Sequence, residues 1–223
     1  RVLFMRRERT FKKTLLFLAI MSVMIFAMSI TASAAATNIK QTDSSKTSVS
    51  ISWDGTNISD GYKVYWSKTE NGTYSEVSSY VSTSKTKYIS GFNAGTTYYI
   101  KVASYANGKN YYAMSAPVQV VTTPESVDYS TIKQTAGTSR SVTVAWGKSA
   151  GATGYLVSKD NGASTAIAKN SITISAKPGQ KYSLNITAFK KAPKTGYVAT
   201  AYKTTRSSFR SAPSTPMYYA DGA

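Results

Sequence analysis

The stretch Ser48-Val49-Ser50-Ile51-Ser52-Trp53 decides the fold, because small polar residues alternate in it with large apolar ones. A period of two residues is typical of a β-strand with one buried and one solvated face. The same pattern returns further along the chain as Ser141-Val142-Thr143-Val144-Ala145-Trp146. The chain is therefore predicted to contain two copies of one β-domain.

Other short segments recur in the same order. Gly61-Tyr62 returns 93 positions later as Gly154-Tyr155, the same separation as between Trp53 and Trp146. Ser115-Ala116-Pro117 is matched by Ser211-Ala212-Pro213. A repeat of about 90 residues indicates duplication of a whole domain, not a solenoid. No segment after residue 36 shows a sustained helical period. The expected fold class is therefore all-β, with two tandem antiparallel β-sandwiches.

Three motifs in each copy resemble the fibronectin type III family, whose fold is an immunoglobulin-like sandwich. In the first copy they are Trp53, Gly61-Tyr62-Lys63-Val64 and Phe92-Asn93-Ala94-Gly95-Thr96-Thr97-Tyr98. In the second they are Trp146, Gly154-Tyr155-Leu156-Val157 and Ala176-Lys177-Pro178-Gly179-Gln180-Lys181-Tyr182. Each copy departs from the family pattern once, since Ala94 replaces a proline and Ala176 replaces a large apolar residue.

The resemblance implies a role for the aromatic residues of these motifs. The last tyrosine of each copy would form a tyrosine corner, with its ring on the core and its hydroxyl bound to the upstream loop. The residues expected to form the structural core are Trp53, Tyr62, Tyr98, Trp146, Tyr155 and Tyr182. We expect the two domains at residues 37–123 and 124–223.

Residues 1–36 have the pattern of an export signal. A basic segment from Met5 to Lys13 precedes an apolar run from Leu15 to Ile30. Ala32-Ser33-Ala34 matches a cleavage site, and Ala34-Ala35-Ala36 offers a second register. The run is shorter than the ~20 residues that span a bilayer. We expect a cleaved signal peptide and a secreted, extracellular protein associated with the cell surface. The alternative is an uncleaved signal anchor.

The chain has no cysteine and no histidine. It therefore lacks disulfides, a thiolate nucleophile, and the usual general base and metal ligand. An exported protein without disulfides favours a bacterial, Gram-positive source. The carboxylates are few, and Asp54 and Asp60 stand beside Gly and Asn in turn sequences, where Asp ordinarily caps a turn. We expect no enzyme activity, no cofactor and no metal site.

The positive charge is uneven between the two copies. The whole chain carries +17, of which residues 37–123 contribute +3 and residues 124–223 contribute +9. Outside the cell, a basic domain meets anionic wall polymers and anionic glycans. The alternative interpretation is that the charge only keeps the protein in solution.

The main candidate site is a long hairpin in the second copy. The stretch from Tyr182 to Pro213 exceeds the matching stretch from Tyr98 to Pro117 by twelve positions, which predicts an insertion of that length. Basic side chains supply attraction to anions, and aromatic ones supply contact area. The candidate binding residues are Lys190, Lys191, Lys194, Tyr197, Tyr202, Lys203, Arg206 and Arg210. The alternative is a solvated hairpin with ordinary strand tyrosines.

A second candidate is the outer face of the first copy. Side chains on two strands that neighbour each other in the resembled fold are expected to form a tyrosine platform for sugar rings or for the second copy. They are Lys63, Tyr65, Tyr99, Lys101 and Tyr105, with Tyr111 and Tyr112 nearby. The alternative is a set of cross-strand pairs that only stabilise the sheet.

These features favour a non-catalytic binding or adhesion protein. Its second domain would contact an anionic cell-wall polymer, a glycan or a protein partner. The alternative is that the two domains are spacer or accessory domains of a larger extracellular enzyme that acts on carbohydrate or peptidoglycan. We expect a monomer, no nucleic acid partner, and no membrane span after signal cleavage.

Overall fold

A computed structural model describes residues 35–55, 60–79, 81–106 and 110–214. Residues 1–34 of the expected signal peptide lie outside the described residues. Within the described ranges the regular structure is β, apart from one turn of 3-10 helix, η1 (Tyr129–Thr131). No helix in these ranges is long and apolar enough to cross a membrane.

Module 1, the part of the chain up to residue 123, folds into two antiparallel sheets in its described residues. The smaller has the order β1-β2-β5, with β1 (Thr37–Ser44), β2 (Ser48–Asp54) and β5 (Thr86–Ser90). The larger has the order β4-β3-β6, and both β7 and β8 pair with β6. Its strands are β3 (Gly61–Ser67), β4 (Ser75–Glu76), β6 (Thr97–Ala106), β7 (Asn110–Met114) and β8 (Val118–Val121).

Module 2, from residue 124 onward, repeats this topology. Its smaller sheet has the order β13-β10-β9, with β9 (Lys133–Gly137), β10 (Ser141–Ala145) and β13 (Ser171–Ser175). Its larger sheet has the order β12-β11-β14, and both β15 and β16 pair with β14. Its strands are β11 (Gly154–Lys159), β12 (Ser164–Ile167), β14 (Lys181–Lys191), β15 (Val198–Thr200) and β16 (Thr205–Arg210).

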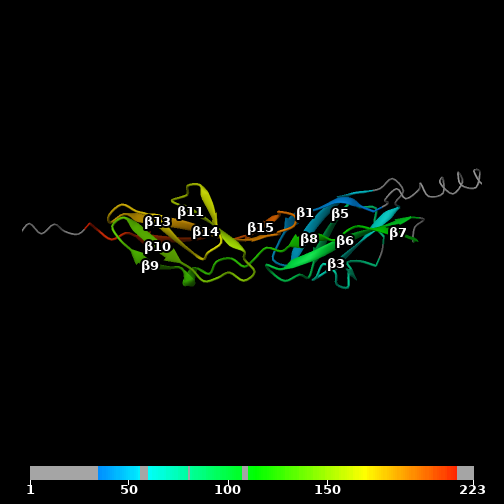
Figure 1. The fold of residues 1–223 in the computed structure, drawn as a ribbon, viewed down its shortest axis with the longest axis horizontal. Coiled ribbons are helices and arrows are strands. Elements are labelled where there is room, and N and C mark those ends of the chain that lie inside the picture. Colours follow the sequence, from blue (N-terminus) through cyan, green and yellow to red (C-terminus); the bar gives the residue numbers. More distant parts are fainter. Residues whose placement is uncertain (1–34, 56–59, 80, 107–109, 215–223) are drawn as a thin grey trace, which may run out of the picture.

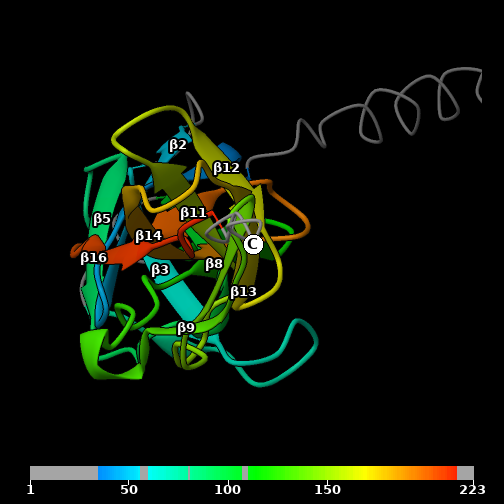
Figure 2. The same cartoon turned by 90° about the vertical axis from the view of Figure 1, so that its left-hand side faces the viewer.

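The two modules lie end to end (Figure 1), and they overlap when the molecule is viewed along its long axis (Figure 2). Each has its own apolar core between its two sheets. The expected all-β fold with two tandem sandwiches is therefore confirmed.

Alternation fills these cores as the sequence predicts. The apolar members of β2, Val49, Ile51 and Trp53, are all buried, while the serines between them are more exposed. Trp53 packs edge-on against Tyr62 of the next strand, with ring centroids 5.6 Å apart. Trp146 packs in the same way against Tyr155 in module 2, at 5.3 Å. The six expected core residues are all buried: Trp53, Tyr62, Tyr98, Trp146, Tyr155 and Tyr182.

Both tyrosine corners form. The hydroxyl of Tyr98 accepts the backbone N–H of Asn93 at 2.9 Å, and that of Tyr182 accepts the N–H of Lys177. The two rings have different neighbours because the modules differ at two positions. Phe92 stacks on Tyr98 with ring centroids 3.9 Å apart, where module 2 has Ala176. Trp66 packs edge-on against Tyr98, whereas the corresponding Lys159 places its ammonium 4.2 Å from the ring centroid of Tyr182.

The predicted length of the insertion in module 2 is wrong. Tyr98 pairs with Val120 of the last strand of module 1, and Tyr182 pairs with Phe209 of the last strand of module 2. Counted between these paired residues, the hairpin region of module 2 is longer by five positions and not by twelve.

The error came from equating Ser115 with Ser211. Ser115 lies in the break between β7 and β8. Ser211 instead corresponds to Thr122: its hydroxyl accepts the N–H of Gln180 at 3.1 Å, just as the Thr122 hydroxyl accepts that of Thr96 at 2.9 Å. Two similar tripeptides at different structural positions produced the false match.

The corner of module 1 makes a testable contribution to stability. Tyr98→Phe keeps the buried ring but removes the acceptor for the Asn93 N–H, so we expect unfolding free energy to fall by about 1 kcal/mol. Urea unfolding followed by tryptophan fluorescence measures this. The control is Tyr88→Phe, because Tyr88 is largely exposed and should tolerate the change. An equal loss in both variants would contradict the assigned role of Tyr98.

Candidate functional site

The candidate hairpin is formed by β14 and β15, and its tip turns toward module 1 (Figure 1). Its tip closes through the N–H of Ala192, which donates to the carbonyl of Tyr197 at 2.8 Å, and that of Gly196, which donates back to Ala192 at 2.8 Å. The tip lies against module 1, because Ala192 is buried with Val121 and the N–H of Lys194 donates to Gln119.

The structure divides the predicted basic residues between the two ends of the module. Lys190, Lys191 and Lys194 lie at or beside the hairpin tip, whereas Arg210 pairs with Lys181 at the start of β14. At ~3.3 Å per residue, the strand from Lys181 to Lys190 corresponds to about 30 Å. The predicted residues therefore do not form one compact cluster.

An apolar contact seats the hairpin tip on the outer face of β8. Val121 is fully buried together with Ala192 and Ala199 of module 2, and the half-buried Tyr197 packs against them. Val120, the neighbour of Val121, points into the core of module 1. Val121 therefore points outward and needs the hairpin as its cover.

Polar contacts surround this apolar centre. The side-chain oxygen of Gln119 accepts the backbone N–H of Lys194 at 3.0 Å, and the ammonium of Lys194 forms an ion pair with Glu70. The hydrogen bond to Glu70 raises the pKa of Lys194. Lys194, predicted as a ligand-binding residue, is thus engaged within the chain.

At a second point of the junction the two backbones come into contact. Gly95, in the tyrosine-corner turn of module 1, has φ 57°, and Gly151 of module 2 has φ 75°. A methyl group on Gly95 would lie 2.5 Å from the Cα of Gly151, a separation that real atoms of this kind do not adopt. Only glycine on both sides permits this approach.

The connecting segment is held at both ends. The N–H of Thr123 donates to the carbonyl of Ser45 at 2.9 Å, and that of Glu125 donates to the carbonyl of Ala150 at 3.2 Å. The carboxylate of Glu125 also forms an ion pair with Lys46 of module 1. Few residues remain to act as a hinge between Thr123 and the buried Val127 of module 2.

In the described residues, side chains of the tyrosine platform of module 1 are linked by hydrogen bonds and an ion pair. The hydroxyl of Tyr65 lies 2.8 Å from that of Tyr105 and donates to Glu76 at 2.9 Å, while Lys63 pairs with Glu76 at 3.2 Å. Burial, followed by the hydrogen bonds to Tyr105 and Glu76, raises the pKa of Tyr65. These interactions join Lys63, Tyr65, Glu76 and Tyr105 to one another.

The same face of module 1 is connected to module 2 through Gln119. The amide of Gln119 donates to the hydroxyl of Tyr99 at 3.4 Å, and Gln119 also binds the hairpin. Lys101 instead lies over the ring of Tyr74, at 4.3 Å from its centroid. The side chains of Tyr111 and Tyr112 lie outside the described residues.

The remaining predicted residues lie along the outer edge of module 2. Lys203 and Tyr202 occupy the break between β15 and β16 and are exposed. Arg206 and Arg210 follow on β16, opposite Asn185 and Lys181. Lys181 was not predicted as a binding residue, although the pairing of the corner strand with the last strand would have placed it beside Arg210.

The residues considered for acid–base or metal chemistry make structural contacts. The carboxylate of Asp54 accepts the side-chain amide of Asn38 at 2.6 Å, and the backbone N–H of Asp60 donates to the carbonyl of Tyr105 at 2.8 Å. In the described part of the chain, no three acidic side chains gather in a way that would hold a metal ion.

The Gly95–Gly151 contact can be tested against an internal control. Gly179 occupies the same corner position in module 2, with φ 66° and no atom within 4 Å of an added methyl. Gly95→Ala and Gly179→Ala therefore carry similar backbone strain, of about 1 kcal/mol, but only the first disturbs the junction.

The readout is the distance between spin labels on Lys68→Cys and Lys169→Cys, one exposed site in each module of a chain that has no other cysteine. We expect a narrow distance distribution in the parent and in Gly179→Ala, and a broad one in Gly95→Ala. Equally narrow distributions in all three would rule out the contact as a constraint on orientation.

Part of module 1 and the whole tandem are similar to known proteins. The family model of the fibronectin type III domain matches residues 34–121. No curated protein is significantly similar to the chain. Among solved structures, a segment of two fibronectin type III domains from chicken tenascin is 19% identical, with 79% of this chain and 99% of that chain covered and a TM-score of 0.44.

A single-module structure is also similar. An Fn3-like protein from Clostridium thermocellum is 27% identical, with 39% of this chain and 92% of that chain covered and a TM-score of 0.35. Domains of this family are generally non-catalytic modules that bind partners or space other domains. Residues 34–121 are a fibronectin type III domain, and the chain continues into a second β-sandwich of the same topology.

Proposed function

We propose that the chain is a secreted, non-catalytic adhesion unit that presents a basic strip of module 2 to an anionic polymer of the cell surface. The basic strip is Lys181, Arg206 and Arg210. The two modules would act as one body, so that the strip is displayed in a defined direction relative to module 1.

The observation that carries this proposal is the register of β14 and β16. Lys181 lies directly opposite Arg210, and Arg206 lies earlier on the same strand as Arg210 and on the same outer face. All three side chains are exposed. None of the ion pairs found among the described residues includes them. Their charges therefore face solvent, where an anionic polymer would neutralise them.

The contacts of the strip leave it accessible. Arg210 donates to the carbonyl of Gly179 at 2.9 Å, and Arg206 approaches the hydroxyl of Ser183 at 3.4 Å. The nearby carboxylate of Asp160 accepts the backbone N–H of Ser183 at 2.8 Å. Both guanidinium groups donate to neutral oxygens, and the carboxylate of Asp160 is joined to Arg206 only through the Ser183 hydroxyl, which donates to it at 3.3 Å.

The fixed junction favours a second function, that of a spacer in a larger extracellular protein. A tandem whose connecting segment is bonded at both ends keeps whatever it joins at a constant separation. This function needs no ligand on the basic strip, so the two proposals predict different results.

Co-sedimentation with purified Gram-positive cell walls separates them. The test variant is Lys181→Ser, Arg206→Ser, Arg210→Ser. The matched control removes the same charge from exposed sites of module 1, as Lys40→Ser, Lys68→Ser, Lys85→Ser. We expect the parent and the control to pellet at low salt, the test variant to stay in solution, and 1 M salt to release the bound proteins, because the screening length falls to about 3 Å.

Two results would overturn the adhesion proposal. If the test variant pellets as the control does, the basic strip is not the binding site. If the parent itself stays in solution at low salt, there is no wall binding to explain, and the spacer function is favoured. Circular dichroism of each variant shows that the sandwiches remain folded.

A further inference from the structure

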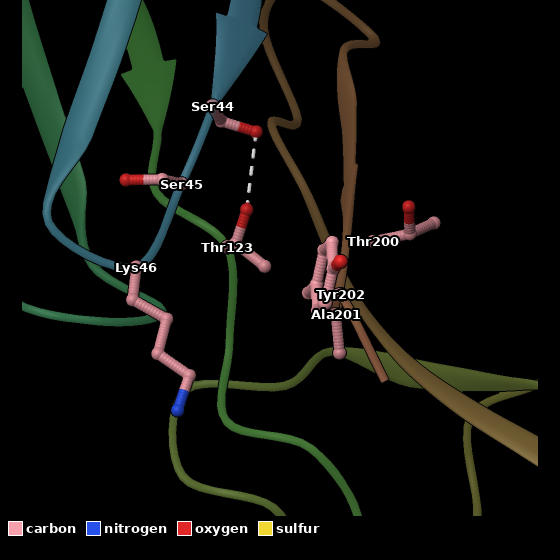
Figure 3. A pocket seen from close by; sticks show the side chains of 7 residues that line it. All are labelled: Ser44, Ser45, Lys46, Thr123, Thr200, Ala201 and Tyr202. Carbon is pink, nitrogen blue, oxygen red and sulfur yellow. Dashed lines mark hydrogen bonds between the residues drawn. The ribbon is translucent and has the colours of Figure 1, made fainter. Parts of the chain in front are cut away.

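A groove lies between the modules, on the side where the β1–β2 turn faces the break between β15 and β16 (Figure 3). Its volume is about 560 Å³, within the ≈ 300–1,000 Å³ typical of small-molecule sites. It is lined by Ser44, Ser45, Lys46, Thr123, Thr200, Ala201 and Tyr202. Because its two walls come from different modules, the groove exists only while the junction holds them together.

The wall formed by module 1 is hydroxyl-rich and fixed. The hydroxyl of Thr123 donates to that of Ser44 at 3.2 Å, which leaves the Ser44 hydrogen available to a further acceptor. The backbone of Thr123 is anchored through Ser45. The Lys46 ammonium pairs with Glu125, and both side chains remain about half exposed. The groove therefore offers polar groups with little net charge.

The opposite wall presents a bare aromatic ring. Tyr202 is 100% exposed, although its neighbour Ala201 is buried and donates its N–H to the carbonyl of Ala188 at 2.8 Å. In Figure 3, Tyr202 lies on the other side of the opening from Ser44, Thr123 and Lys46. A fixed backbone thus holds a large apolar surface in water at the edge of a hydroxyl-lined groove.

We propose that this groove binds an uncharged carbohydrate chain. A sugar ring has an apolar face, which would stack on Tyr202, and a rim of hydroxyls, which would bond to Ser44 and Thr123. An anionic ligand has less to gain here than on the basic strip, because Glu125 already neutralises Lys46. This site goes beyond the adhesion function proposed above, since it uses other residues, another ligand class and the junction itself.

The test measures binding of three uncharged probes to the two-module protein by calorimetry. The probes are β-1,4-linked oligosaccharides of glucose, xylose and N-acetylglucosamine. We expect at least one to bind, with an affinity that is the same at low and high salt because no charges pair. Tyr202→Ala should weaken binding about tenfold or more, since losing a stacked ring costs roughly one power of ten.

Two further variants make the result specific. Tyr88→Ala removes another largely exposed tyrosine, on β5, and should bind as the parent does. Ser44→Met places a longer uncharged side chain in the groove from the module 1 side and should also weaken binding. The basic-strip variant, Lys181→Ser, Arg206→Ser, Arg210→Ser, should bind the sugars unchanged, so that failure of one proposal is separable from failure of the other.

The proposal is overturned if none of the three probes binds. It is also overturned if Tyr202→Ala binds as tightly as the parent, or if Tyr88→Ala loses as much affinity as Tyr202→Ala. Since Tyr202 is fully exposed, its replacement should leave thermal unfolding unchanged, and the unfolding curve of each variant is measured beside its affinity.

Discussion

The seating of a module 2 hairpin on the outer face of β8 is the interaction on which the arrangement of the whole molecule depends. Val121 is buried there by Ala192 and Ala199. At a second contact, Gly95 and Gly151 bring backbone against backbone. Because these two contacts flank a short connecting segment, we expect the two domains, each with its own core, to move as one body.

The apolar centre of this junction matters more than its polar rim. Burying a valine side chain contributes roughly 2 kcal/mol, and without the hairpin Val121 would face water. The ion pair between Lys194 and Glu70 is solvent-exposed, so it adds specificity of position more than stability. The extra hairpin residues of module 2 are thus explained by packing on module 1, although the sequence favoured a ligand for them.

Sequence reasoning succeeded where the pattern is local. The alternation around Trp53 and the motif ending in Tyr98 each specify a strand, the face that is buried, and a hydrogen bond within a few residues. It failed where the answer depends on contacts between distant segments. Gln119 and Lys194 are far apart in the chain, and nothing in the sequence around either residue predicts their contact.

One local signal of the junction was present. In the segment Val118-Gln119-Val120-Val121, two adjacent valines break the alternation expected of a strand with one wet face. An outward valine at that point indicates a partner, but not which partner. The basic residues of module 2 were likewise visible, whereas their division between the two ends of β14 follows only from the strand register.

Nitrogen-15 relaxation of the chain from residue 37 onward tests the fixed junction most directly. If the modules move as one body, backbone amides of both will report a single anisotropic rotational diffusion tensor with its long axis through both modules. If the junction does not hold, each module will report its own, faster tumbling time, close to that of a domain of its size alone. We expect the first result, and the second would contradict a fixed junction between the modules.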